Sequence, residues 1–275
     1  MPRETKDKLA RLRDILQDLD SALLAFSGGV DSSFLLKVAH DMLGEKVVAV
    51  TSDSETMARP ELQLAQSMAK SIDCKHILIK TNEMCDPDFV ANSPDRCFHC
   101  KKTLFGKLTE LAREHNLKYV IEGSNIDDVS DYRPGFRAIE QYGVRSPLKE
   151  AGLTKDDIRV LSKSMGLSTW DKPAAPCLAS RIPYGSEVTP EKLHRIEKSE
   201  EYLHSLGLRV VRVRDHGAVA RIEAPPENLP MLIDPAKSAE ISDSLKSFGY
   251  QYVAVDLKGF RSGSLNEPLK DEQDG

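Results

Sequence analysis

Short apolar runs alternate with segments of helical apolar spacing through the first half of this 275-residue chain. The runs that carry a strand pattern are Leu23–Phe26, Lys46–Thr51, His76–Ile79 and Lys118–Gly123. The segments with helical spacing are Leu9–Leu19, Ser33–Leu43, Pro60–Ile72 and Lys101–His115. Strands and helices that alternate with short linkers predict an α/β fold, a doubly wound parallel sheet with helices on both of its faces.

Composition narrows the class of protein. A hydrophobic content of 40% with 29% charged residues is typical of a globular domain. No apolar run approaches the roughly 20 residues of a membrane span, and residues 1–16 are charged, with no apolar signal core. Five cysteines in a chain of this length form no disulfide framework, so we expect the cytoplasm. The net charge of −5 provides no general attraction to nucleic acid, and we expect neither nucleic acid nor a membrane as partner.

The sequence SGGVDSS, residues 27–33, follows the first predicted strand and opens a predicted helix. Two adjacent glycines allow successive N–H groups to point into one concavity, and the helix adds its positive N-terminal end. The predicted phosphate ligands are Ser27, Gly28, Gly29, Asp31, Ser32 and Ser33, with Asp31 also able to hold magnesium or orient the loop. The loop lacks the Gly-Lys-Ser/Thr ending of a Walker A motif, which argues against γ-phosphate cleavage. It resembles the PP-loop of enzymes that split ATP into AMP and pyrophosphate; a turn without ligand is the alternative.

Two further segments fall at carboxyl ends of predicted strands, where ligands of such sheets bind. They are Thr51–Met57 and Glu122–Asp128. In the second, Gly123 would let the backbone approach a nucleotide, and Asn125 and the two aspartates after it offer hydrogen bonds or metal ligation. The alternative is a helix cap or a turn, since Asn and Asp are common in both.

A cysteine pair lies at the mouth of the predicted helix Lys101–His115. The thiols of Cys97 and Cys100 are biased toward thiolate there by the helix dipole and by Lys101 and Lys102. Two thiols are too few for zinc or an iron–sulfur cluster. The candidate third ligand is Cys177, in a loop stiffened by two prolines.

Several readings of this cysteine trio remain open. Three thiolates can hold three irons of a [4Fe–4S] cluster and leave the fourth iron free to accept sulfide. The same thiols could carry a persulfide, bind zinc together with His99, or be three ordinary cysteines. Sulfur chemistry suits an enzyme that splits ATP, because adenylation turns a carboxylate oxygen into a good leaving group that a sulfur nucleophile displaces.

The pattern changes near Thr189, which predicts a boundary between domains 1–186 and 187–275. The second domain is predicted to be a small α+β unit for substrate binding or oligomerisation. Its expected elements are a helix at Glu191–Leu206, a hairpin of Arg209–Arg214 and Ala218–Glu223, a helix at Pro235–Phe248 and a strand at Tyr250–Leu257.

Two arginines of the predicted hairpin share one face of a strand. Arg212 and Arg214 are two residues apart, so their side chains start about 7 Å from each other. Paired guanidinium groups suit a phosphate monoester. The alternative is a solvated edge strand whose charges deter aggregation.

Five stretches together resemble the LarE-type ATP-dependent sulfur transferases, PP-loop proteins of the HUP fold that serve biosynthesis of the nickel-pincer nucleotide cofactor of lactate racemase. The stretches are SGGVDSS, PDRCFHCKK, EGSNIDD, KPAAPCLASRIPYG and RVVRVRDHG. The resemblance implies that a carboxylate of a pyridinium biscarboxylate mononucleotide is adenylated and that sulfur then replaces AMP. Some members sacrifice the sulfur of a single cysteine at the position of Cys177; others have all three cysteines and hold a [4Fe–4S] cluster. This chain has the three, so it resembles the second type.

The resemblance also implies roles for residues of this chain. ATP and Mg²⁺ would bind the SGGVDSS loop, with weaker candidates at Ser52, Met57, Gly123 and Asn125. Cys97, Cys100 and Cys177 would hold the sulfur centre. Lys101, Ser180 and Arg181 would line the reaction site. Arg212 and Arg214 would bind the substrate phosphate. The family implies a homo-oligomer and a sulfide donor or cofactor-maturation partners.

Other functions use similar parts. A tRNA 2-thiolation enzyme can use the same nucleotide loop and the same set of three cysteines. It needs a broad basic surface, however, which the net charge of this chain does not supply. A non-catalytic nucleotide sensor, or a ligase of the NAD or GMP synthetase type, would leave the cysteine trio without a role.

Overall fold

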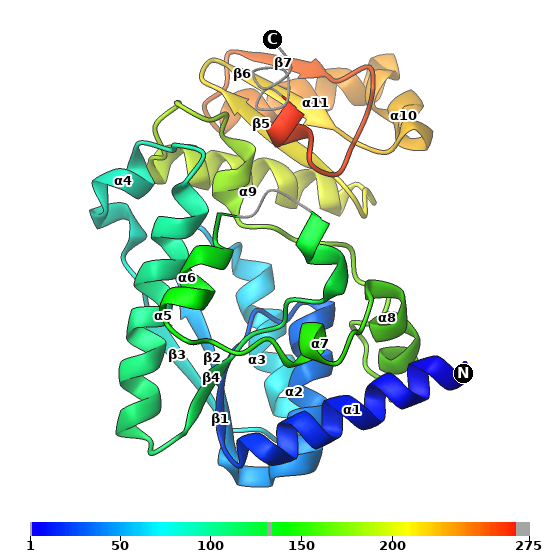
Figure 1. The fold of residues 1–275 in the computed structure, drawn as a ribbon. Coiled ribbons are helices and arrows are strands. Elements are labelled where there is room, and N and C mark those ends of the chain that lie inside the picture. The colour runs from blue at the N-terminus through cyan, green and yellow to red at the C-terminus, as the bar shows by residue number, and fades with distance from the viewer. Residues whose placement is uncertain (1, 131–133, 268–275) are drawn as a thin grey trace. The chain divides into compact units, whose positions relative to one another are not determined.

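The computed structural model describes residues 2–130 and 134–267, which form two compact units (Figure 1). Unit 1 comprises the chain up to Asp86 together with Pro94–Ala175, and unit 2 comprises Pro87–Ser93 and the chain from Pro176 onward. The units therefore divide at residue 175, eleven positions before the predicted boundary, because the loop around Cys177 packs with unit 2. The assignment of nucleotide and substrate to separate domains stays a prediction.

Unit 1 is built on a four-stranded sheet with the order β3-β2-β1-β4. Every pairing is parallel, and Leu24 lies opposite both Ala49 and Ile121. The strands are β1 (Ala22–Ala25), β2 (Val47–Asp53), β3 (His76–Lys80) and β4 (Tyr119–Ile121). The predicted parallel α/β sheet is confirmed.

Helices cover both faces of this sheet (Figure 1). Ala22 and Leu24 of β1 join one hydrophobic core while Leu23 joins the other, as the period of two along a strand requires. The helices of the first core are α1 (Arg3–Leu19), α2 (Val30–Leu43), α3 (Arg59–Ile72), α7 (Pro147–Glu150) and α8 (Lys155–Ser164). The helices of the second core are α5 (Arg96–Glu114) and α6 (Phe136–Gln141).

Unit 2 packs helices against one face of a three-stranded sheet with the order β5-β6-β7. The predicted hairpin pairs antiparallel, and the last strand runs parallel to its neighbour. The elements are α4 (Pro87–Val90), α9 (Pro190–Ser205), β5 (Arg212–His216), β6 (Val219–Glu223), α10 (Leu229–Ile233), α11 (Pro235–Ser247) and β7 (Tyr252–Val255). Short 3₁₀ segments occupy Gly44–Lys46, Glu83–Cys85, Ile126–Ser130, Leu178–Arg181, Pro226–Asn228 and Ser264–Asn266. Among the described residues, no helix combines the length and apolar character needed to cross a bilayer.

Helix α8, which was not predicted from the sequence, begins with a reciprocal cap. Thr154 and Asp157 form a capping box, and the Asp157 carboxylate also accepts bonds from Thr5 (2.7 Å) and Lys8 (2.8 Å) of α1. One carboxylate therefore starts α8 and ties it to α1. The Thr-x-x-Asp spacing is a sequence signal that could have located this helix.

We expect Asp157→Asn to lower the free energy of unfolding at neutral pH by about 2 kcal/mol. Burial by itself raises the pKa of Asp157, but hydrogen bonds from Lys8, Thr5 and Thr154 outweigh it and lower that pKa from 3.8 to about 2. Because the folded-state pKa is depressed, the stabilisation is complete above pH 4 and is lost as the pH falls toward 2. Urea unfolding of both proteins between pH 7 and pH 2.5 measures it, and the difference between them should shrink with acid.

The matched control is Asp156→Asn, one position earlier on the exposed side of the same turn. It should leave the free energy of unfolding almost unchanged. An equal loss in both variants would show that helix charge, rather than the Asp157 contacts, is responsible.

Candidate active site

The SGGVDSS loop joins β1 to α2 in a conformation that requires glycine. Gly28 has φ of +69°, and a Cβ there would lie 2.8 Å from the backbone Cα of Ala65 in α3. Gly29 is the N-cap of α2, and the hydroxyl groups of Ser27 and Ser32 lie 3.1 Å apart beside it. The loop thus packs on α3 and leaves Ser27 exposed at the start of the helix, as an anion site requires.

The last serine of the loop has a different environment. Ser33 is fully buried, and its hydroxyl oxygen makes no hydrogen bond within the described residues. Its role as an ATP ligand stays a prediction.

Asp31, in the first turn of α2, is paired with a lysine that the sequence does not identify. The Nζ of Lys155, at the start of α8, forms an ion pair with Asp31 Oδ2, and Asn125 Nδ2 donates to Asp31 Oδ1 at 3.4 Å. Burial raises the pKa of Asp31, and the negative charge of the neighbouring Asp128 raises it further. The Lys155 ammonium group lowers it, but not enough to offset the burial. A carboxylate in this setting needs a cation beside it, which fits the predicted magnesium ligand.

A second lysine holds the loop itself. Lys172 Nζ donates to the carbonyl of Gly28 at 3.3 Å and pairs with Glu61 of α3 at 2.5 Å. Lys172 opens the KPAAPC stretch, so the residue lay within a recognised motif, but only the fold reveals its contact with the loop.

The other two predicted segments also reach the carboxyl edge of the sheet. Ser52, in β2, forms a hydrogen bond with Thr81, whose hydroxyl donates to the buried carboxylate of Glu83 at 2.6 Å. Cys100 Sγ lies 3.9 Å from the same carboxylate, so Glu83 links the edge of the sheet to the cysteine pair. The predicted ligand Met57 is half-buried against the core.

Gly123 brings the segment after β4 close to the loop helix. A Cβ at Gly123 would lie 3.1 Å from the backbone nitrogen of Ser32, so the absence of a side chain serves packing on α2. Asn125 is 2% exposed and is held by Asp127 N, which donates to its Oδ1 at 2.9 Å. Asn125 therefore has a fixed amide that points at Asp31.

The cysteine pair lies inside α5. This helix begins at Arg96 after the N-cap Asp95, so the predicted start at Lys101 is wrong by five residues. Cys97 is exposed and Cys100 half-buried, and three-residue spacing places them on one helix face. Lys101 packs against Gly135, where a Cβ would lie 2.7 Å from its Cδ.

Cys177 belongs to unit 2 and is exposed. The loop that carries it is fastened by Arg181, which is 3% exposed and binds Glu200 of α9 through two bonds of 3.0 and 2.8 Å. Arg181 Nη1 also donates to the carbonyl oxygens of Pro176 (2.6 Å) and Cys177 (3.2 Å) and to Ser180 Oγ (3.0 Å). Arg181 thus fixes the backbone at Cys177, and the meeting of Cys177 with the other two cysteines stays a prediction.

Arg212 and Arg214 are buried, so the alternative of a solvated edge strand is wrong. The sequence could not show that the 3₁₀ turn at Leu178–Arg181 and Ser264 approach this face. Arg214 binds Glu223 Oε2 (2.7 Å), Ser264 Oγ (2.8 Å) and the carbonyl of Ser180 (2.8 Å). Burial lowers the pKa of Arg212 to about 10, with the charges of Arg181 and Arg214 adding to the effect.

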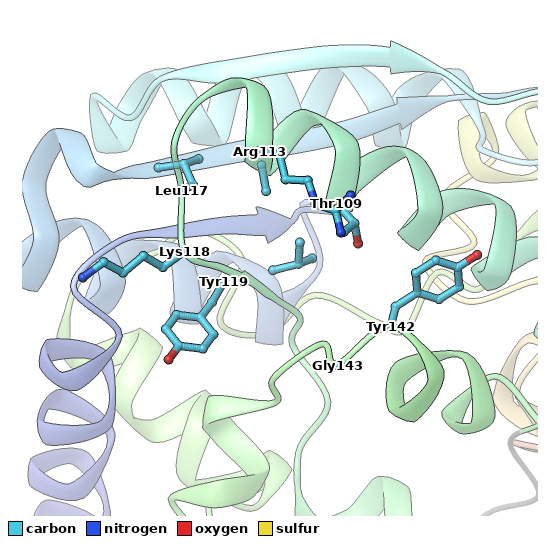
Figure 2. A pocket seen from close by; sticks show the side chains of 9 residues that line it. Thr109, Arg113, Leu117, Lys118, Tyr119, Tyr142 and Gly143 are labelled. Carbon is cyan, nitrogen blue, oxygen red and sulfur yellow. The ribbon is translucent and has the colours of Figure 1, made fainter.

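A surface depression of about 210 Å³ lies at the other edge of the unit 1 sheet. Figure 2 shows its labelled lining, which includes Arg113, Lys118, Tyr119 and Tyr142 around the start of β4. The depression lies at the amino-terminal ends of the strands, whereas the SGGVDSS loop follows the carboxyl end of β1. None of the predicted site residues lines it.

A parallel sheet whose first strand ends in a glycine loop, with carboxylates and lysines at the same edge, defines a nucleotide-binding α/β protein of the PP-loop class. The Asparagine synthase family model matches residues 17–123, which contain β1 to β4.

Comparison with curated proteins identifies the family. The chain is 36% identical to the pyridinium-3,5-bisthiocarboxylic acid mononucleotide synthase of Lactiplantibacillus plantarum, over 97% of this chain and 96% of that protein. Uncharacterised proteins of Synechocystis sp. and Methanocaldococcus jannaschii are 46% and 30% identical, covering 96% and 93% of this chain and 98% of each relative. The chain belongs to the LarE family, as the sequence motifs predict.

Proposed function

We propose that the protein is an ATP-dependent sulfur transferase that converts a carboxylate of a pyridinium biscarboxylate mononucleotide into a thiocarboxylate. The observation that carries the proposal is the likeness to the Lactiplantibacillus plantarum synthase, which extends along nearly the full length of both chains. The PP-loop and the three cysteines supply the two chemistries that such a reaction needs.

The reaction divides into two substitutions. A carboxylate oxygen of the substrate attacks the α-phosphorus of ATP, the bond from that phosphorus to the bridging oxygen breaks, and pyrophosphate leaves with the electron pair. Sulfide then attacks the carbonyl carbon of the acyl adenylate, a C–S bond forms, the C–O bond breaks, and AMP leaves. Neither step changes an oxidation state, and the second is favoured because AMP is a far better leaving group than oxide.

Residues of both units have roles in this scheme. The N–H groups that follow Gly28, with Ser27 and Ser32, would bind the phosphate chain of ATP. In unit 2, Arg212 and Arg214 would bind the substrate phosphate. Burial is the main cause of the lowered pKa of Arg212, with the charges of Arg181 and Arg214 adding to it, and a dianionic ligand beside the guanidinium would stabilise its charged form.

Two inorganic groups complete the proposal. Asp31 and Asn125, at the loop, would hold Mg²⁺, which neutralises phosphate charge. The trio Cys97, Cys100 and Cys177 consists of cysteines outside any disulfide, two of them on one helix face, and this donor set fits a [4Fe–4S] cluster. Bound there, the cluster would keep one iron available for the sulfide that is transferred.

The setting of the reaction follows from its chemistry. Thiols that serve as ligands must stay reduced, so we place the protein in the cytoplasm. The substrate is a small nucleotide, and the expected partner is a sulfide donor. The family implies that the protein forms a homo-oligomer and serves biosynthesis of the nickel-pincer cofactor of lactate racemase.

The test is pyrophosphate release from ATP by anaerobically purified protein, with and without pyridinium biscarboxylate mononucleotide. We expect release that depends on this substrate, together with about four iron and four sulfide per chain and a brown colour. Colourless, active protein that loses one sulfur from Cys177 by mass would instead establish the sacrificial route. Release that depends on tRNA would establish a thiolation enzyme.

A further inference from the structure

Two lysines of unit 1 converge on one aromatic ring. The ring belongs to Phe136, the first residue of α6, and is half-buried. Lys101 Nζ lies 5.7 Å from the ring centroid, and Lys149 Nζ lies 5.2 Å from it. Both distances are those of a cation–π contact, so α5 and α7 bring two positive charges to the same ring.

The backbone holds both lysines in place. Lys149 belongs to the short helix α7, which begins after the N-cap Ser146 and buries Leu148 in the first core. The stem of Lys101 lies against Gly135, where a Cβ would come within 2.7 Å of the lysine Cδ. Because Gly135 has no side chain, Lys101 can reach the ring from α5, and only the ends of the two flexible stems are free to adjust to a ligand.

Neither ammonium group has a carboxylate partner within residues 2–130 and 134–267. An aromatic ring attracts a cation, but it carries no net charge and cannot neutralise one. Other basic side chains between residues 145 and 172 do form ion pairs, namely Arg145 with Glu150, Lys155 with Asp31 and Lys172 with Glu61. Two half-buried lysines without a counter-ion therefore form a site that favours an anion.

The pair of Lys101 and Lys149 lies beside the segment that carries predicted nucleotide ligands. Helix α7 packs against the 3₁₀ segment Ile126–Ser130, which directly follows Asn125. Asn125 in turn donates to Asp31, in the first turn of α2. An anion bound by the two lysines would thus lie at the carboxyl edge of the sheet, as the SGGVDSS loop does.

The proposed substrate supplies such an anion. Its pyridinium ring carries two carboxylates, and while one attacks ATP the other stays ionised and requires a cationic partner. We propose that Lys149, together with Lys101, binds this second carboxylate. Charge-assisted hydrogen bonds then hold the ring so that the first carboxylate faces the α-phosphorus of ATP. The inference rests on the proposed function and deepens it, because it names the residue that selects a dicarboxylate.

The experiment is isothermal titration calorimetry of the full-length protein with two ligands, the pyridinium biscarboxylate mononucleotide and the corresponding monocarboxylate mononucleotide. Mg²⁺ and an ATP analogue with a methylene group between the α- and β-phosphorus are present, so that neither ligand is consumed. The unaltered protein should bind the biscarboxylate more tightly. Lys149→Met should reduce this preference about tenfold or more, the loss typical of a charge-assisted hydrogen bond, and Lys149→Arg should recover part of it.

The matched control is Lys163→Met, which removes an exposed lysine whose Nζ lies 4.3 Å from the centroid of the Trp170 ring, and it should leave the preference unchanged. Equal losses of affinity for both ligands in Lys149→Met would show a general structural role and overturn the inference. So would equal affinity of the unaltered protein for the two ligands, or a preference that Lys149→Met leaves intact. Failure of the unaltered protein to bind the biscarboxylate would overturn the proposed function itself. Thermal unfolding confirms that each variant is folded, and Lys149→Arg retains the charge should Lys149→Met unfold.

Discussion

Replacing Gly28 with alanine should reduce ATP affinity by about 100-fold or more, because the native loop becomes inaccessible at a cost of ~3 kcal/mol. An alanine at φ of +69° is strained, and its Cβ would overlap the Cα of Ala65, which belongs to the backbone of α3 and cannot rotate away. The loop must therefore leave its position on α3. Calorimetric titration with ATP and Mg²⁺ measures the effect.

A control variant separates the backbone strain of a positive φ from the steric clash of the new Cβ with α3. Gly166, after α8, has φ of +72°, and a Cβ there would meet open space. Gly166→Ala should cost about 1 kcal/mol of stability and leave ATP affinity unchanged. Unaltered ATP binding by Gly28→Ala would mean that this loop does not hold the nucleotide.

The variants Cys97→Ala, Cys100→Ala and Cys177→Ala should each abolish sulfur transfer while pyrophosphate release continues. Sulfur transfer needs all three ligands, whereas adenylation needs only the loop and the substrate site. Thiocarboxylate formation, pyrophosphate and iron content are measured on the same anaerobic preparations. We expect product at background level and iron lost with it.

Cys85→Ala is the matched control, since Cys85 is also an exposed cysteine of unit 1. It should retain iron and product. Repeated turnover by Cys97→Ala would show that the cluster assignment is wrong, and loss confined to Cys177→Ala would favour the sacrificial route.

The strands of the parallel sheet could be predicted to within a few residues because apolar runs and their turns are local signals. The helix that contains Cys97 was predicted to begin five residues late. Its first turn is polar and mixed, and the N-cap Asp95 starts it without an apolar pattern. Helices α6 and α7 were missed for a related reason, since they are short and packing, rather than propensity, stabilises them. Helix α8 was missed although its Thr-x-x-Asp capping box is a local signal.

The candidate site could be predicted in part. The motifs located the loop, and the fold places Ser52 and Asn125 at the same edge of the sheet. The contacts of Lys172 and Glu83 were missed because no local pattern shows which distant group a lysine or a glutamate will meet. Their roles depend on contacts with Gly28 and Cys100, which the chain reaches only after folding.

Local sequence was enough to predict the parallel α/β architecture, the PP-loop and the family, because periodicity, glycine geometry and motif spacing are properties of short segments. Tertiary structure alone decided that Lys155 faces Asp31, that Arg181 fastens the Cys177 loop, and that Arg212 and Arg214 are buried. Each of these facts depends on which distant segments meet, and the energy of a charge is set by its burial and its partners.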